Sequence, residues 1–178
     1  MTHQVQSWLA EQQDFLEKTL FDWASINSGS YHLDGVNRMV DQAEVFFEAL
    51  QGQMTRVQLP TCERLNDQSE LEPVQVGDLL PVTKRPEAPY QVLLCGHLDT
   101  VFPKDHPFQQ VSKEKGIIHG PGVADMKGGV IVMRSALMAF EQFCPSPQIG
   151  WTVILNPDEE IGSLASRTIL DDYAVQAD

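Results

Sequence analysis

The sequence predicts an α/β sandwich with a mostly parallel central sheet. Short apolar runs alternate along the chain with segments of helical periodicity, an order typical of strands connected by helices. Of the 178 residues, 42% are hydrophobic and 8% are aromatic, which suits a protein that buries one core. Residues 1–178 are therefore expected to form part of a single domain.

The first half of the chain is predicted to begin with two helices. Residues 5–24 place large apolar side chains at spacings of three and four, the pattern of one apolar stripe on an amphipathic helix. After a polar, Gly-containing loop, residues 36–50 are again helical, and Gly52 can end that helix. Residues 54–59 alternate like a strand, and a weak strand is predicted at residues 71–76.

The second half contains apolar runs that lead directly into polar residues. Residues 90–95 predict a strand buried on both faces, and residues 117–118 and 150–156 predict two more strands. Helices are predicted at residues 130–143 and 164–170. In open α/β sheets ligands gather at the carboxyl ends of strands, so the polar residues that follow these runs are candidate functional residues.

His97 and Asp99 follow the strand predicted at residues 90–95. On an extended chain, a spacing of two aims both side chains in the same direction. An imidazole that binds zinc usually donates its second N–H to a carboxylate or carbonyl, so one of the pair can bind a metal while the other orients it. A surface histidine beside an aspartate is the alternative, because His-x-Asp alone is a weak motif.

Asp125 lies at a predicted loop-to-helix junction among Gly120, Gly122, Gly128 and Gly129. Glycines allow the backbone to approach another group closely. A carboxylate at this position can bridge two cations with its two oxygens. The alternative is a helix N-cap, in which the aspartate satisfies free backbone N–H groups.

Asp158, Glu159 and Glu160 follow the strand predicted at residues 150–156. Unpaired like charges raise one another's pKa, and nearby cations would remove that conflict. One glutamate can bind metal while its neighbour accepts a proton from water that zinc acidifies. A solvated acidic turn is the alternative. Together, the three clusters supply the nitrogen and oxygen ligands that zinc accepts.

The overall charge disfavours two classes of partner. The chain has 25 acidic and 12 basic residues and a formal net charge of -13, which repels phosphate backbones and anionic lipid heads. Neither nucleic acid nor a membrane is therefore an expected partner. Cys62, Cys95 and Cys144 have no CxxC spacing, and neither a signal peptide nor a membrane-spanning segment is predicted, so a cytoplasmic protein is expected.

Three blocks of the sequence resemble, in order and separation, the signature blocks of a known family. They are His97-Leu-Asp99-Thr-Val, Gly120-Pro-Gly-Val-Ala-Asp125-Met-Lys-Gly-Gly and Asp158-Glu159-Glu160-Ile-Gly-Ser. The family is that of the dizinc metallopeptidases and amidohydrolases, which includes glutamate carboxypeptidase, aminoacylase and succinyl-diaminopimelate desuccinylase. The resemblance is greatest to the glutamate carboxypeptidase branch and runs from about Trp8 to the C-terminus.

The resemblance implies a role for each candidate residue. His97 would bind one zinc ion, and Asp99 would orient that histidine. Asp125 would bridge two zinc ions, Glu160 would bind the second, and Glu159 would be the general base. Co²⁺ or Mn²⁺ would also suit one imidazole and several carboxylates. The resemblance further implies a three-layer, zinc-exopeptidase-like sandwich and a cis peptide bond between Asp125 and Met126.

The implied activity is hydrolysis of an amide or peptide bond next to a carboxylate-bearing residue, as in a carboxypeptidase or an N-acyl-amino-acid hydrolase. The family continues with a further acidic ligand, a lid domain with dimer contacts and a distal histidine. We therefore expect an N-terminal portion of the catalytic domain, lacking the lid and the C-terminal part and inactive by itself. The substrate would carry a free carboxylate, and the full-length protein would be a homodimer through its lid.

Two alternatives belong to other functional classes. The first is a non-catalytic binding or interaction module that shares the fold, because two ligands per metal rarely hold a site well. The second is a single-metal hydrolase of the deaminase type, which is disfavoured because neither a cysteine pair nor a His-x-Glu pattern is present.

Overall fold

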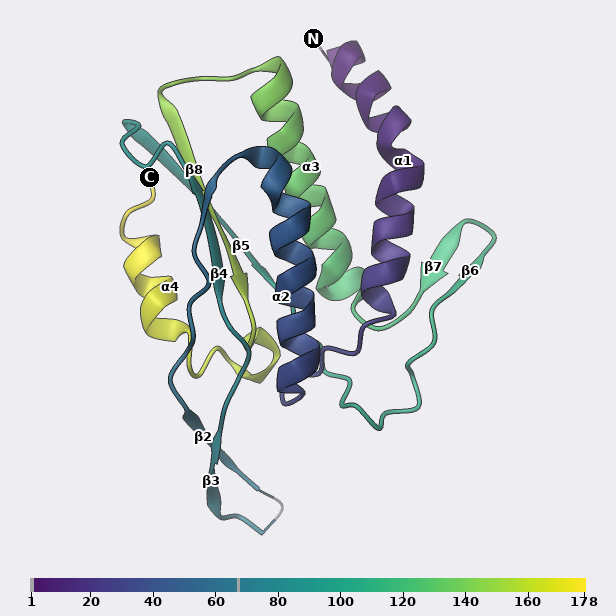
Figure 1. The fold of residues 1–178 in the computed structure, drawn as a ribbon, viewed down its shortest axis with the longest axis vertical. Helices are drawn as coiled ribbons and strands as arrows, with labels where there is room; N and C mark the ends of the chain where they lie inside the picture. Colours follow the sequence, from purple (N-terminus) through teal and green to yellow (C-terminus); the bar gives the residue numbers. More distant parts are fainter. Residues whose placement is uncertain (1, 67) are drawn as a thin grey trace.

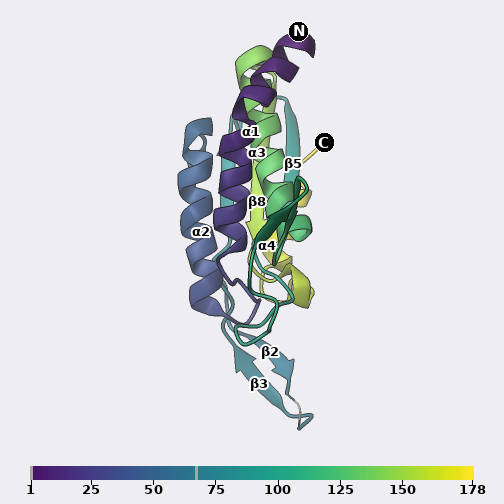
Figure 2. The ribbon, with the colours of Figure 1, turned by 90° about the vertical axis from the view of Figure 1, so that its right-hand side faces the viewer.

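A four-stranded sheet separates three helices from a fourth in the computed structural model, which describes residues 2–66 and 68–178. Helices α1 (Thr2–Ala24), α2 (Leu33–Phe47) and α3 (Gly128–Phe143) cover one face of the sheet, and α4 (Arg167–Ala174) covers the other (Figures 1 and 2). The three-layer α/β architecture is therefore confirmed. Among the described residues, none of the helices combines the length and apolar character needed to cross a bilayer.

The sheet is mixed rather than mostly parallel, which corrects the prediction. Its order is β1 (Gln53–Met54), β4 (Leu80–Lys84), β8 (Ile149–Asn156) and β5 (Tyr90–His97). β5 runs parallel to β8, whereas β4 is antiparallel to β8 and β1 is antiparallel to β4. Only residues 85–89 connect β4 to β5, too few for the crossover that parallel strands need, so these two strands run in opposite directions.

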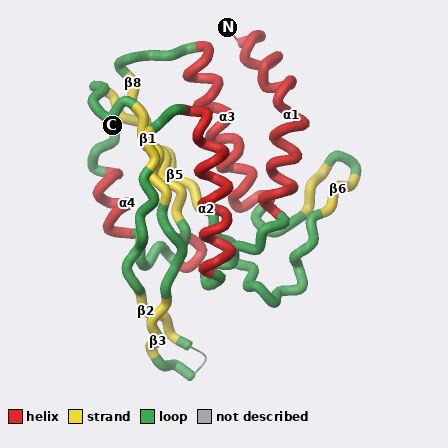
Figure 3. Tube along the Cα trace, viewed as in Figure 1, coloured by secondary structure: helices red, strands yellow, loops and turns green. Residues whose placement is uncertain are grey.

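Two small hairpins lie outside the main sheet (Figure 3). One pairs β2 (Cys62–Leu65) with β3 (Leu71–Val74), and the other pairs β6 (Ser112–Glu114) with β7 (Ile117–His119). The prediction missed β2, β4 and β6. All three residues of β6 are exposed, so this strand forms through backbone pairing and has no apolar pattern to detect.

Several elements begin or end at residues other than those predicted. The strand predicted at residues 54–59 is limited to β1 and a single bridge between Val57 and Leu79. Gln51, not Gly52, takes the left-handed conformation that ends the helical segment, with φ of 55°. The last helix begins at Arg167 rather than residue 164, because residues 164–166 form a turn that precedes it.

β5 is an edge strand, which corrects the prediction that it is buried on both faces. Within the described part of the chain it pairs only with β8. Its Val92 side chain is 47% exposed, and Cys95 is also exposed. The apolar run correctly predicted a strand. Whether that strand lies at the centre or the edge of the sheet depends on how many other strands pair with it, and the run does not contain that information.

β8 is the centre of the core because its side chains alternate between the two faces of the sheet. Trp151, Val153 and Leu155 pack in the cluster with α1, α2 and α3. Ile154 points to the other face and packs in the cluster that includes residues of α4. All four side chains are almost fully buried, and each such burial stabilises the fold by roughly 1.5–3 kcal/mol.

Glu141 connects α3 to the sheet through a cluster of hydrogen bonds. Its carboxylate accepts two hydrogen bonds from the Arg85 guanidinium and one from Trp151 Nε1 at 2.9 Å, and it lies 3.2 Å from Lys84 Nζ. Chiefly through Arg85, and despite partial burial, these donors lower the pKa of Glu141 from its ordinary 4.5 to about 2.

We predict that Glu141→Gln lowers the free energy of unfolding by about 1.5–3 kcal/mol near neutral pH, the usual contribution of hydrogen bonds to charged groups. Because the folded pKa lies below 4.5, the contribution of Glu141 is complete above that pH and is lost as the pH falls toward 2. Urea unfolding at neutral and acidic pH measures both effects. Glu11→Gln, at an exposed position of α1, is the control; equal losses in the two variants would contradict the prediction.

Candidate metal centre

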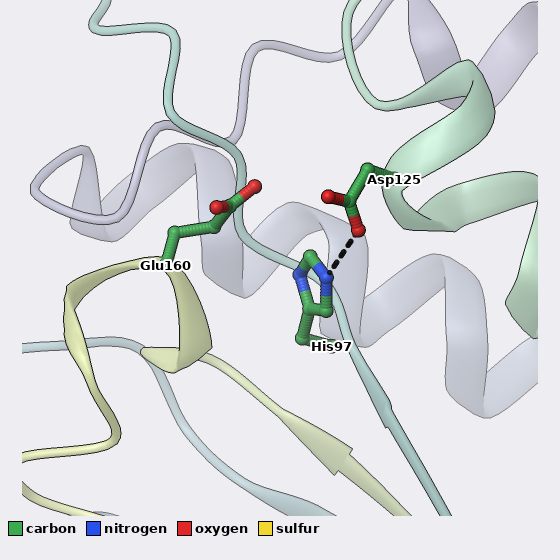
Figure 4. Close-up of side chains that lie close together, drawn as sticks. All are labelled: His97, Asp125 and Glu160. Atoms are coloured by element: carbon green, nitrogen blue, oxygen red, sulfur yellow. Dashed lines mark hydrogen bonds and ion pairs between the residues drawn. The ribbon is translucent and has the colours of Figure 1, made fainter.

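Three of the predicted site residues converge at one rim of the sheet (Figure 4). His97 is the last residue of β5, Asp125 lies in the turn before α3, and Glu160 lies in the short helical turn Glu159–Ile161 after β8. One potential ligand atom from each residue lies within 4.8 Å of the other two. His97 Nε2 is 2.9 Å from Asp125 Oδ1. The three residues are therefore placed to hold a cation together.

The parallel pairing of β5 and β8 explains this convergence. The register places His97 opposite Asn156, so the two strands end at the same level. The Leu98 N–H continues the pairing by donating to the Asn156 carbonyl at 2.8 Å. Side chains that follow the two strands are therefore brought to one edge, as expected for the carboxyl ends of parallel strands.

The His97 ring is buried and fixed from both sides. Nδ1 lies 3.1 Å from the Asp99 carbonyl oxygen and 3.3 Å from Asp99 Oδ1, while Nε2 faces Asp125. Burial alone would lower the pKa of His97, but hydrogen bonding to Asp99 and Asp125 outweighs burial and raises the pKa to about 9. The ring is therefore held with Nε2 directed at the cluster of carboxylates.

Asp99 is fully buried and connects three parts of the site. Besides facing His97, its carboxylate accepts hydrogen bonds from the backbone N–H groups of Glu159 at 3.2 Å and Glu160 at 3.1 Å. It also accepts a hydrogen bond from Ser30 Oγ at 2.6 Å. Sequence reasoning missed Ser30, because it lies in a polar loop 69 positions from Asp99 with no motif around it.

Asp125 is exposed and does not cap α3. The N-cap position belongs to Lys127 and has no side-chain hydrogen bond, so the N-cap alternative is wrong. The Asp125–Met126 peptide bond is cis, as the family resemblance implies. Gly122 precedes this turn with φ of 71°, a conformation that L side chains rarely adopt.

Lys127 anchors the turn that carries Asp125. Its side chain is fully buried, and Nζ donates to the carbonyl oxygens of Trp23 at 3.1 Å and Ile26 at 2.8 Å. Burial lowers the pKa of Lys127 to about 8. The lysine thus connects the C-terminal end of α1 to the candidate site, where a cation also interacts favourably with the helix dipole.

The three acidic side chains of the turn after β8 lie in different environments. Glu160 points to His97 and Asp125, and burial together with the negative charge of Asp125 raises its pKa despite the opposing effect of His97. Glu159 is 55% exposed, with Oε2 at 3.8 Å from His97 Nε2. Asp158 is fully buried and accepts hydrogen bonds from Ala165 N–H and Ser166 Oγ, so it stabilises the following turn.

This donor set fits a divalent cation. Four carboxylates, those of Asp99, Asp125, Glu159 and Glu160, lie around one imidazole, and burial together with repulsion from the other three carboxylates raises the pKa of Glu160. Imidazole nitrogen and carboxylate oxygen suit Zn²⁺ and other first-row metals. The geometry agrees with the ligand roles predicted for His97, Asp125 and Glu160, and those roles stay predictions.

Residues 93–178 match the family model described as peptidase family M20/M25/M40. This part of the chain is similar to the M20 peptidase family. Carboxypeptidase G2 of Pseudomonas sp. (strain RS-16) is 28% identical over 172 residues, which cover 94% of this chain and 38% of the relative. Succinyl-diaminopimelate desuccinylase of Helicobacter pylori (strain HPAG1) is 40% identical over 76 residues, which cover 40% of this chain and 19% of that protein.

A solved M20-like fold matches almost the whole chain. Human carnosine dipeptidase 1 superimposes with a TM-score of 0.78 and 21% identity, covering 97% of this chain and 38% of the dipeptidase. This similarity confirms the fold. The chain spans less than two fifths of the length of each of these relatives. Enzymes of the M20 family are metal-dependent, which agrees with the cluster of His97, Asp125 and Glu160.

We predict that zinc raises the thermal unfolding midpoint of the chain and that EDTA reverses the increase. At a free zinc concentration 100 times Kd, the free energy of unfolding should rise by about 2.7 kcal/mol. His97→Ala should abolish the shift, whereas His119→Ala, at an exposed position of β7, should retain it. A full shift in the His97→Ala variant, or no shift in the wild type, would show that the cluster does not bind zinc.

Zinc binding should also release a proton from His97. The imidazole must be neutral to bind metal, and its pKa of about 9 means that it is protonated at neutral pH. Apparent affinity should therefore rise by about tenfold per pH unit up to about pH 9. Calorimetry in two buffers of different protonation enthalpy counts the protons released; a zinc affinity that is unchanged between about pH 6 and 8 would be inconsistent with His97 as a ligand.

Proposed function

We propose that the protein is a metal-dependent hydrolase that cleaves an amide or peptide bond. The convergence of His97, Asp125 and Glu160 at the end of the β5–β8 pair is the observation that carries the proposal. The match of residues 93–178 to the M20 peptidase family supports the same reaction class. Residues 1–178 would form the N-terminal portion of the catalytic domain, in a cytoplasmic protein.

The proposed cofactor is a pair of Zn²⁺ ions, and Co²⁺ or Mn²⁺ would suit the same donors. His97, Asp125 and Glu160 would hold these ions, His97 the first, Glu160 the second and Asp125 both. When bound, the cations supply Lewis acidity to water and to the scissile carbonyl. The full burial of Asp99 and its contact with His97 Nδ1 support the role of Asp99 as the group that orients the ligand.

Glu159 is the proposed general base. It is the neighbour of a proposed ligand, and its carboxylate is exposed and 3.8 Å from His97 Nε2, so it can reach a water molecule beside the cluster. Glu159 removes a proton from the attacking water and then delivers that proton to the departing amine nitrogen. This assignment separates metal binding by Glu160 from proton transfer by Glu159.

The proposed substrate is a small molecule or peptide that bears a free carboxylate beside the scissile bond. The names of the relatives, a carboxypeptidase and a succinyl-diaminopimelate desuccinylase, support this class. The net charge of -13 favours neither nucleic acid nor anionic membranes as partners. Homodimerisation through a lid domain is part of the same proposal.

A non-catalytic binding module is the second candidate function. Among the described residues, a single group of three side chains could hold a metal ion. Shared between two cations, three side chains leave few protein ligands for each. This count favours a chain that retains the fold and binds metal weakly without turnover.

We predict that Glu159→Gln in the full-length protein lowers kcat by about a hundredfold to ten-thousandfold, the usual contribution of a general base. Its metal content should remain unchanged, because Glu160 and not Glu159 is the proposed ligand. Hydrolysis of N-acyl amino acids and dipeptides, together with metal analysis, measures both quantities.

The control is Glu87→Gln, an exposed residue in the turn before β5, at the end of that strand away from His97. It should retain both turnover and metal. Near-normal turnover in the Glu159→Gln variant would reject Glu159 as the base.

A further inference from the structure

We propose that Ser30 is a positioning residue of the metal centre. By fixing the Asp99 carboxylate, Ser30 keeps the His97 ring and the turn of Glu159 and Glu160 in their mutual arrangement. Because the groups it orders belong to the proposed metal centre, the inference rests on the proposed function.

The backbone of the Ser30 loop is held against the segment that follows β5. The Thr100 N–H donates to the Ser28 carbonyl at 2.9 Å, and the Ser30 N–H donates to the Thr100 carbonyl at 3.2 Å. Gly29 forms a parallel bridge with Thr100 between them. A Cβ atom on Gly29 would lie 2.5 Å from the Phe102 carbonyl oxygen, so this close approach requires glycine. The position of Ser30 is thus set by backbone contacts.

The Ser30 hydroxyl makes a short hydrogen bond to a buried charge. Ser30 is 5% exposed and Asp99 is fully buried, and the distance from Ser30 Oγ to Asp99 Oδ2 is 2.6 Å. This distance is typical of a hydroxyl that donates to an ionised carboxylate, an interaction about twice as strong as a neutral hydrogen bond. A buried carboxylate that lost this donor would be left partly unsatisfied.

Ser30 differs in origin from the other donors around Asp99. The N–H groups of Glu159 and Glu160 and the imidazole of His97 all belong to segments that supply the cluster itself. Ser30 comes from the loop between α1 and α2, which supplies none of the three clustered side chains. Ser30 is therefore the donor that fixes the Asp99 carboxylate relative to the loop between α1 and α2.

Ser28 provides a matched control for this role. It lies in the same loop and is fully buried, but its Oγ has no hydrogen-bond partner among the described residues. Ser28→Ala and Ser30→Ala each remove one buried hydroxyl from this loop. Only Ser30→Ala removes a hydrogen bond to Asp99, so a difference between the two variants reports that bond.

The first test is amide hydrogen exchange in the metal-free chain, followed by NMR. Ser30→Ala should accelerate exchange at the Glu159 and Glu160 amides by at least about tenfold, because both donate to the carboxylate that Ser30 holds. Ser28→Ala should leave the two rates within about twofold of the wild type. Equal rates in the two variants would overturn the proposal.

The second test is a double-mutant cycle on zinc affinity, measured by calorimetry. Ser30→Ala should weaken zinc binding by about 10–100-fold, as loss of a residue that orients a ligand does, whereas Ser28→Ala should not. In an Asp99→Asn background, Ser30→Ala should cause little further loss, because its effect passes through Asp99. An equal loss in both backgrounds would indicate a packing role and overturn the proposal.

Failure of the proposed function can be distinguished from failure of the role proposed for Ser30. A wild-type chain that takes up no zinc contradicts the proposed metal centre. The exchange rates of the Glu159 and Glu160 amides need no metal, so they still support or overturn the effect of Ser30 on Asp99.

Discussion

The parallel pairing of β5 with β8 sets the geometry on which the site depends. It places His97 level with Asn156, so the chain leaves both strands at one rim and the turn containing Glu160 returns toward the histidine. The same pairing buries β8 between two groups of side chains, one facing α1 to α3 and the other facing α4. Core packing and the convergence of the candidate ligands therefore have a common origin.

The buried charge of Asp99 is the second constraint. A carboxylate without solvent exposure is costly unless hydrogen-bond donors surround it, and Asp99 is surrounded by two backbone amides, one hydroxyl and one imidazole. Each donor comes with a segment of chain attached, so satisfying one charge also fixes the relative positions of three segments. This requirement explains why a carboxylate that lies outside the candidate ligand cluster is central to the site.

The sequence was sufficient to predict which side chains meet, because that depends on local features. His97, Asp125 and Glu160 each follow an apolar run or precede a helix, and strand ends gather at one edge. Strand direction and exposure could not be predicted in the same way. The strand β4 was itself missed, so its antiparallel direction was not predicted either. The edge position of β5 depends on which strands pair with it, and the contact of Ser30 with Asp99 depends on a loop that no motif marks.

Lys127 connects the N-terminal helix α1 to the candidate site. Its ammonium group contacts the carbonyl of Trp23, in the last turn of α1 and 104 positions away, and that of Ile26, just after the helix, while Asp125 lies two residues before Lys127. Tilting or removing α1 would take the Trp23 carbonyl away from this buried ammonium group, close to the residue proposed to bridge two metals. The end of the N-terminal helix therefore helps to hold the turn that carries Asp125, and a change there is expected to displace that residue.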